Sequence, residues 1–78
     1  MGEDELAGQV RRIVAEVCAL DLAQVRDEAR LASFGVDSVR AVDVLVAIED
    51  QLGVAIEDEE ASRLTTVGDL VARVRRSA

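Results

Sequence analysis

Apolar residues recur at steps of three and four along most of this chain, and this spacing is what most restricts its fold. A helix places residues three and four apart on one face, whereas a half-buried strand needs strict alternation. The first such stretch runs from about Asp4 to Leu20, and its apolar positions are Leu6, Val10, Ile13, Val14 and Val17. No proline interrupts the pattern. We therefore predict an all-α fold.

The same spacing defines the remaining helices. The most regular one is predicted over Ser38–Leu52, where Gly53 provides the usual stop. One or two helical turns are expected over residues 57–64. The last helix should open at Thr66, because Asp69 three residues later completes a capping-box pattern.

The stretch between the first two helices, residues 21–37, has no helical period. We predict a long ordered loop there, held in place by four apolar side chains: Leu22, Val25, Leu31 and Phe34. Loops longer than about 12–15 residues are uncommon in compact domains and are usually functional. This loop ends near Gly35, which permits a tight approach to the next helix.

A net charge of −7 over 78 residues restricts the partners. An acidic surface repels nucleic acid phosphates and anionic lipids, and it attracts basic patches on other proteins. No apolar run approaches the roughly 20 residues that span a membrane, and the acidic start is unlike a secretory signal. We expect a single domain over residues 1–78, a cytoplasmic monomer that binds neither nucleic acid nor membranes.

The chain lacks most of the groups that catalysis uses. It has no histidine and one cysteine, Cys18, so Ser-His and Cys-His pairs and the usual zinc sites cannot form within it. A small all-helical fold also leaves little room for a substrate pocket. We predict no enzymatic activity and no metal site, and we interpret Cys18 as a buried apolar side chain.

The second helix carries two apolar stripes, although a helix packed on one side needs only one. The first comprises Ala41, Val44, Leu45, Ile48 and Leu52. The second comprises Val39, Val42 and Val46, and it lies beside Asp43, Glu49 and Asp50. Apolar side chains ringed by acids are typical of a partner site. If the helix instead lies centrally in the bundle, both stripes belong to the core. We give the partner-site and core interpretations equal weight for Val42, and we favour exposure for Val39 and Val46.

Acidic residues are concentrated in this part of the chain. Residues 37–60 hold eight of the sixteen acids, against one base, Arg40. A charge run is usually only a solvated face, but this concentration causes self-repulsion that such a face does not need. We interpret it as a surface that steers basic partners and makes their association sensitive to salt. It includes Glu57 and Asp58 of the third helical segment.

Ser38 stands at the head of the second helix. A serine there is by default an N-cap, although Asp37 is an equally good one. Helix N-termini also favour phosphate, because free N–H groups and the helix dipole both suit an anion. Ser38 is therefore well placed to bear a phosphodiester.

The residues around Ser38 resemble a known signature. The run Leu31-x-x-Phe34-Gly35-Val36-Asp37-Ser38-Val39 looks like the L-x-x-L-G-x-D-S-L of acyl carrier proteins. The family's second helix is similar to Val44-Leu45-x-x-Ile48-Glu49-Asp50-x-Leu52. Its third helix and the following turn resemble Ile56-x-Asp58-Glu59-Glu60-Ala61 and Leu64-Thr65-Thr66-Val67. The resemblance covers nearly the whole chain in the right order.

This resemblance implies an antiparallel four-helix bundle with a long loop between helices 1 and 2 and a short third helix. It implies that a phosphopantetheinyl transferase moves 4′-phosphopantetheine from coenzyme A onto Ser38 and recognises Asp37 beside it. The arm would carry acyl groups as thioesters, and Ala47 and Leu64 would line a shelter for them. Acyltransferase, ketosynthase-type or acyl-activating enzymes with basic docking patches would meet a face comprising Val39, Arg40, Val42, Asp43, Val46, Glu49, Asp50, Glu57 and Asp58.

Three residues depart from the signature: Phe34 and Val39 replace leucine, and Arg40 stands where acidic or neutral residues are frequent. All nine basic residues are arginines, which suggests a GC-rich genome. This and the departure at Arg40 favour a polyketide or related specialised pathway over housekeeping fatty-acid synthesis. The nearest alternative is a peptidyl carrier, which usually has G-G-x-S before its attachment serine. Here Asp37 precedes Ser38, and this favours the acyl type. The alternative from another class is an unmodified acidic module that binds basic proteins. A chain that begins at Met1 favours a discrete carrier.

Overall fold

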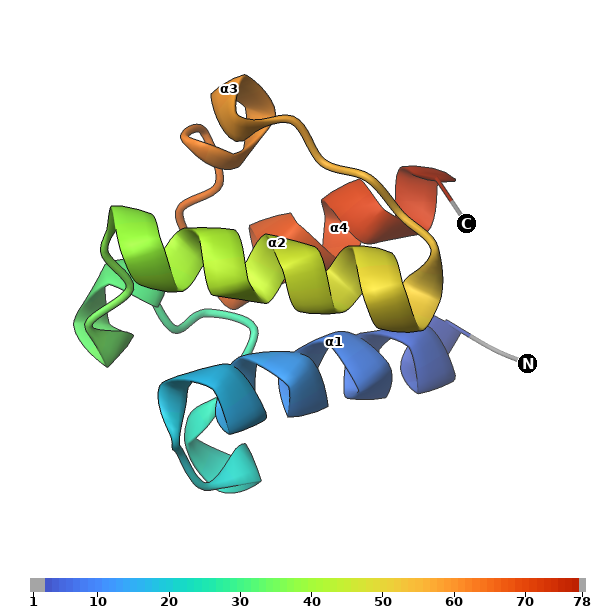
Figure 1. The fold of residues 1–78 in the computed structure, drawn as a ribbon. Coiled ribbons are helices and arrows are strands. Elements are labelled where there is room, and N and C mark those ends of the chain that lie inside the picture. The colour runs from blue at the N-terminus through green and yellow to red at the C-terminus, as the bar shows by residue number, and fades with distance from the viewer. Residues whose placement is uncertain (1–2, 78) are drawn as a thin grey trace.

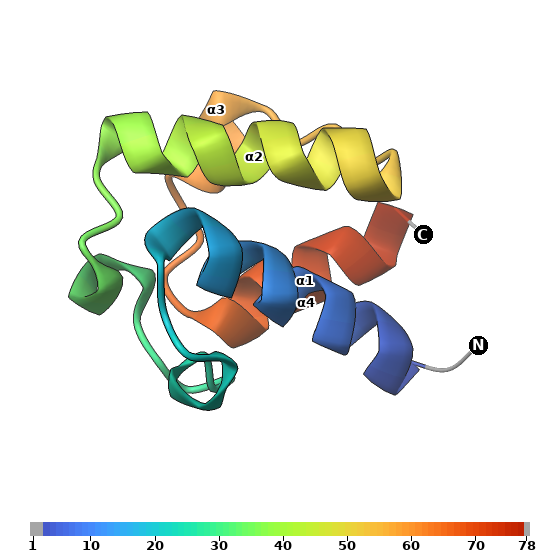
Figure 2. The ribbon, with the colours of Figure 1, turned by 60° about the horizontal axis from the view of Figure 1, so that its bottom comes forward.

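The computed structural model describes residues 3–77, with the side chains of residues 5–37 and 39–77, and this part of the chain contains four α-helices and two short 3₁₀ helices. They are α1 (Glu3–Cys18), η1 (Leu22–Gln24), η2 (Leu31–Phe34), α2 (Ser38–Leu52), α3 (Asp58–Ala61) and α4 (Val67–Ser77). Both α2 and α4 pack on α1 and run opposite to it, as Figures 1 and 2 show. The all-α prediction and the four-helix bundle with a short third helix are confirmed.

The core lies where α1, α2 and α4 meet. Within the described residues its buried side chains are all aliphatic: Ala7, Val10, Ile13, Val14, Ala15, Val25, Val44, Ile48, Val54, Ile56, Val67, Leu70, Val71 and Val74. The stripe predicted on α1 is confirmed at its centre, whereas Leu6 and Val17 lie at the edge and are half-buried. No helix in this range is both long enough and apolar enough to cross a membrane.

The first helix ends two residues before the predicted boundary. Ala19 adopts a left-handed backbone conformation with φ of 55°, and Leu20 N–H then donates to the carbonyl of Ala15 at 2.8 Å. A helix cannot continue through such a residue. The loop that follows is partly wound into η1 and η2. Val25 is buried as predicted, whereas Leu22 is 50% exposed and lines a shallow hollow with Gly8, Arg11 and Arg12 of α1.

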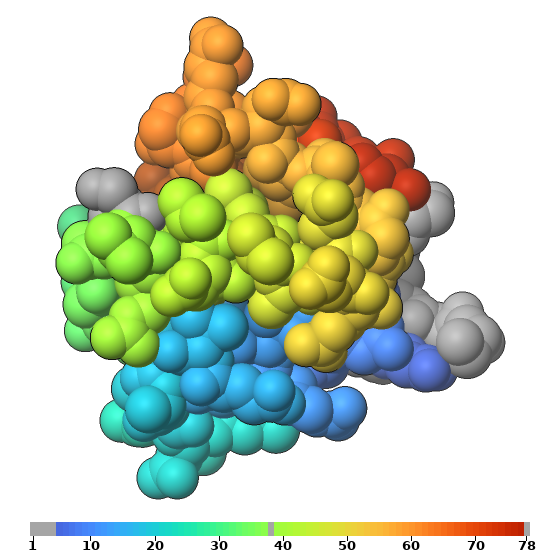
Figure 3. Space-filling model, viewed as in Figure 1, coloured from blue at the N-terminus to red at the C-terminus, as the bar shows by residue number. Residues whose placement is uncertain are grey.

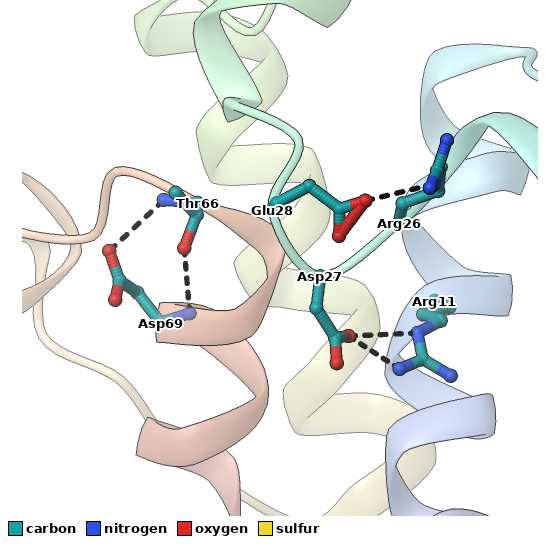
Figure 4. A network of polar contacts seen from close by, with 6 residues as sticks. All are labelled: Arg11, Arg26, Asp27, Glu28, Thr66 and Asp69. Atoms are coloured by element: carbon teal, nitrogen blue, oxygen red, sulfur yellow. Dashed lines mark hydrogen bonds and ion pairs between the residues drawn. The ribbon is translucent and has the colours of Figure 1, made fainter.

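Backbone hydrogen bonds tie this loop to the start of α4. The N–H of Val67 donates to Ala29 at 3.0 Å, and the N–H of Gly68 donates to Asp27 at 2.8 Å. Asp27 also accepts from the guanidinium of Arg11 on α1, with an Nε–Oδ1 distance of 3.1 Å (Figure 4). The loop is therefore fastened to two helices before it leads into α2.

Local signals at the ends of the other helices are confirmed. Thr66 N–H donates to Asp69 Oδ2 and Asp69 N–H donates to Thr66 Oγ1, each at 3.1 Å (Figure 4). This is the predicted capping box of α4. Gly53 ends α2 with φ of 70°, and its N–H donates to Glu49. The start of α1 and the end of α4 lie at one end of the molecule, and the start of α2 lies at the other (Figures 1 and 2).

Candidate attachment and docking site

The start of α2 is defined by two turns of the backbone. Gly35 ends η2 with a left-handed φ of 73°, and its N–H donates to Ala32 at 3.2 Å. Asp37 is extended, and its Oδ1 accepts the N–H of Arg40 at 2.9 Å. Asp37 is thus the N-cap, and Ser38 is the first residue of the helix. Of the two capping candidates, the aspartate takes this task, so the serine is not needed for it.

The head of α2 fits a covalently bound phosphodiester. The side chain of Ser38 lies outside the described residues, but Asp37 and Val39 on either side are exposed, so a group attached between them would reach solvent. The first N–H groups of a helix have no partner within it, and they favour an anion. Among these N–H groups, that of Arg40 already donates to the Asp37 side chain.

A cavity of about 570 Å³ opens beside this helix start. Its walls come from η2, α2, α3 and the start of α4, and the residues that line it are Leu31, Ala32, Val36, Asp37, Ala41, Val42, Val44, Leu45, Asp58, Ala61, Ser62, Leu64, Thr65 and Leu70. The lining is mostly aliphatic. Because Asp37 belongs to it, the cavity is adjacent to Ser38. It is large enough for an apolar group of small-ligand size.

Of the two residues expected to line this cavity, one does so. Leu64 is part of its wall. The prediction for Ala47 is wrong, because Ala47 packs against the buried core instead. At about 100° per residue, Ala47 points roughly 200° away from Leu45, which does line the cavity.

The second apolar stripe of α2 is exposed. Val39, Val42 and Val46 are 72%, 49% and 53% exposed, respectively. This confirms the expectation for Val39 and Val46, and it decides the open question about Val42. The acidic neighbours Asp43, Glu49 and Asp50 are exposed as well. In Figure 3, α2 forms a continuous band across this face, between α1 and α3. The stripe and its acids thus share an accessible helix.

Arg40 is exposed but engaged within the molecule. Its Nη1 donates to the carbonyl of Val17 near the end of α1 at 2.8 Å, where a cation suits the negative end of the helix dipole. Burial raises the pKa of the neighbouring Cys18 thiol, and the charge of Arg40 partly opposes that rise. Cys18 is half-buried rather than buried. Arg40 therefore joins α1 to the first turn of α2, whichever partners it also meets.

The acids of α3 and of its N-cap, Glu57, do not form one uniform surface. Glu57 and Asp58 are exposed, and Asp58 also lines the cavity. Glu60 instead forms an ion pair with Arg73 of α4, with Nε–Oε2 and Nη2–Oε1 distances of 2.7 and 3.0 Å. Sequence reasoning missed Arg73, because nothing local marks a pair of residues 13 positions apart. No described acid belongs to a cluster of three or more side chains that could hold a metal ion.

Comparison with known proteins identifies the class. Residues 8–74 match the family described as "Phosphopantetheine attachment site", so the chain belongs to the phosphopantetheine-binding carrier proteins. The "Acyl carrier protein" of Thermotoga maritima is 32% identical over 74 residues, which cover 94% of this chain and 91% of that protein. Phosphopantetheine is accordingly the cofactor of this protein. Members of this family are not catalytic themselves and work with partner enzymes.

The fold is shared with a solved carrier protein. The crystal structure of a free-standing peptidyl carrier protein from an Acinetobacter baumannii secondary metabolic pathway superposes with a TM-score of 0.81 at 19% identity. The match covers 96% of this chain and 94% of that one. At this identity the likeness concerns the fold alone, and it leaves open whether the cargo is acyl or aminoacyl.

Proposed function

We propose that this protein is an acyl carrier protein whose 4′-phosphopantetheine arm is attached to Ser38 and whose cargo is an acyl group. The observation that carries the proposal is the head of α2. There Asp37 caps the helix, exposed residues flank Ser38, and the cavity opens alongside. The terminal thiol of the arm supplies the thioester chemistry that the chain itself lacks.

The attachment step requires little of the chain besides an accessible hydroxyl. Ser38 Oγ forms a bond to the phosphorus of coenzyme A that carries pantetheine, and the bond from that phosphorus to adenosine 3′,5′-bisphosphate breaks. The hydroxyl proton leaves to a base on the phosphopantetheinyl transferase, which also binds magnesium. Asp37 holds the helix start in place and is the residue that the transferase recognises. The helix N-terminus stabilises the resulting phosphodiester anion.

The cavity supports a role in sheltering part of the cargo. Its aliphatic wall, including Leu45, Leu64 and Leu70, would bury apolar carbon atoms of an acyl chain. Asp37 and Asp58 are the only charged residues among those that line it. An acyl chain entering from the arm on Ser38 would therefore pass from a polar rim to an apolar interior.

The exposed stripe of α2 supports docking to enzymes with basic patches. Val39, Val42 and Val46 supply apolar contact area, and the surrounding acids steer the approach of a basic surface. These acids are Asp43, Glu49, Asp50, Glu57 and Asp58. We include Arg40 on the same face, and we place its partners among acyltransferase, ketosynthase-type and acyl-activating enzymes, with the carrier a single-domain, cytoplasmic monomer.

For the pathway, we favour polyketide or related specialised biosynthesis, with fatty-acid synthesis as the alternative. Arg40 is the residue behind this choice, since it places a positive charge on a docking face that is otherwise acidic. The similarity to an acyl carrier protein and the presence of Asp37 before Ser38 support an acyl cargo over an aminoacyl one.

Mass spectrometry tests the attachment directly. The purified protein is incubated with coenzyme A, magnesium and a broad-specificity phosphopantetheinyl transferase. We expect one phosphopantetheine increment. Trypsin cuts after arginine, so one peptide between Arg30 and Arg40 contains both Ser33 and Ser38. Ser38→Ala should abolish the increment, whereas Ser33→Ala should retain it.

Ser33 is a matched control because its hydroxyl donates to the carbonyl of Arg30 at 2.7 Å, within η2 and away from the helix head. If the folded protein stays unmodified while a known carrier is modified in parallel, the proposal fails. An acidic interaction module that needs no modification would then be the better explanation. That module predicts that Ser38→Ala leaves binding to basic partners intact.

A further inference from the structure

The third helix is the least embedded wall of the cavity beside Ser38. It has four residues, none of them buried, and it stands on the side of α2 opposite α1 (Figures 1 and 2). The chain before it is anchored by Val54 and Ile56, which are buried in the core. A helix this short has little stability of its own. Its position therefore depends on contacts with the rest of the protein.

Glu60 fastens this helix to α4 through a close ion pair with Arg73 and a longer one with Arg76, whose Nη2 lies 3.9 Å from Oε2. Two guanidinium nitrogens of Arg73 donate to the Glu60 carboxylate, Nε to Oε2 at 2.7 Å and Nη2 to Oε1 at 3.0 Å. The Arg73 side chain is only 12% exposed, and that of Glu60 is 38% exposed. Arg73 is further oriented by Ser77 Oγ, which lies 2.6 Å from Nη1. Bidentate, partly shielded pairs of this kind are stronger than ordinary surface ion pairs. We call the Glu60–Arg73 pair the clasp.

The clasp and the cavity lie on different faces of α3. Asp58 and Ala61 line the cavity, opposite Ala41 and Leu45 of α2. Glu60 is two residues beyond Asp58 and so points about 200° away from it, toward α4. The clasp therefore fixes the cavity wall from behind. The hydrogen bond from Arg73 also lowers the pKa of Glu60, so the carboxylate is charged at neutral pH.

We propose that the Glu60–Arg73 clasp controls access to the cavity, because it holds α3 in place as the movable wall. Without the clasp, α3 swings away from α4 and the cavity exchanges its contents with solvent more readily. For the acyl cargo this inference rests on the proposed function, and it then assigns to Arg73 the residence time of cargo inside the carrier. For any apolar molecule of suitable size it holds without modification of Ser38.

The test compares Glu60→Gln and Arg73→Gln with Glu59→Gln in the unmodified protein. Glu59 is the matched control, since it lies on the same helix, carries the same charge, and pairs among the described residues with the exposed Arg63 at 3.7 Å. Amide hydrogen exchange is followed at Ala61, whose N–H donates to Glu57 at 2.9 Å. We expect exchange about three- to fivefold faster in the two clasp variants than in the control.

Entry into the cavity is measured with Nile red, a neutral apolar dye. Its association should be faster in both clasp variants than in Glu59→Gln. The double variant Glu60→Gln/Arg73→Gln should match Glu60→Gln, because Arg73 acts on α3 through Glu60. Equal exchange rates in Glu60→Gln and Glu59→Gln would overturn the clasp. Faster exchange with unchanged dye entry would overturn the link to the cavity. Neither measurement needs Ser38 to be modified. A negative result here would therefore refute the clasp without bearing on the attachment of phosphopantetheine, and the reverse also holds.

Discussion

Val44 and Val46 offer a direct separation of folding from docking. Both lie on α2 and undergo the same change to alanine, but Val44 is 5% exposed and Val46 is 53% exposed. Removing two buried methyl groups costs about 1.6 kcal/mol in transfer free energy, and the cavity left behind adds about 1 kcal/mol. Alanine returns about 0.5 kcal/mol through its better helix propensity. Val44→Ala should therefore destabilise the fold by about 2 kcal/mol.

Val46→Ala should change stability by only about 0.3 kcal/mol, because half of the side chain is already in water and no closed cavity forms. A domain of 78 residues has a free energy of unfolding of about 4–12 kcal/mol, so both variants remain folded. Urea unfolding followed by circular dichroism measures the difference, since the chain has no tryptophan or tyrosine for fluorescence. With a slope near 1 kcal/mol/M, the midpoint should fall by about 2 M for Val44→Ala and by about 0.3 M for Val46→Ala.

The order should reverse for function under conditions where both variants are folded. In the unmodified protein, Val46→Ala should weaken association with a partner enzyme, whereas Val44→Ala should leave that association unchanged, because Val44 lines the cavity but not the exposed stripe. Equal losses of stability would contradict the assignment of the two stripes to core and surface. A Val46→Ala variant with unaltered partner binding would instead remove this residue from the docking face while leaving the fold assignment intact.

Two further predictions concern helix ends. Gly53→Ala should destabilise the fold by about 1 kcal/mol, because alanine is strained at a φ of 70°. The control Gly8→Ala, in open space within α1, should stabilise it by up to about 1 kcal/mol in the same urea assay. Hydrogen bonds from Thr66 and Thr65 lower the pKa of Asp69 below its ordinary value of 3.8, so its stabilisation is complete above that pH and is lost as the pH falls through the folded pKa. The stability difference between the protein and Asp69→Asn should shrink as acid is added below pH 3.8, and a constant difference would contradict this cause.

Local patterns predicted much of the fold and the helix that carries the site. The two stripes of α2 repeat at steps of three and four residues, and the stop at Gly53 and the capping box of Thr66 and Asp69 each lie within about one turn of helix, so the sequence displays them directly. The signature around Ser38 is likewise contiguous. Such features depend on short-range geometry, and the structure reproduces them.

Contacts between distant residues were not predictable in this way. The clasp joins residues 13 positions apart, and Gly68 binds Asp27 across a much longer separation. A β-carbon on Gly68 would lie 3.1 Å from the Asp27 carbonyl oxygen, so a glycine suits this close approach of the two backbones. The prediction that Leu22 helps to hold the loop in place fitted less well for a related reason. The exposure of its side chain depends on how η1 packs on α1, which its hydrophobicity alone does not determine.

The placement of the two chain ends has a practical consequence for how this protein can be held. Because α1 begins and α4 ends at the pole opposite Ser38 (Figure 1), anything joined to either end is separated from the serine by the length of α2. Fifteen residues of helix span about 22 Å. A tag, a solid support or a fused domain at either end would therefore leave the attachment serine and the exposed valines facing outward. Both ends are equivalent anchors in this respect.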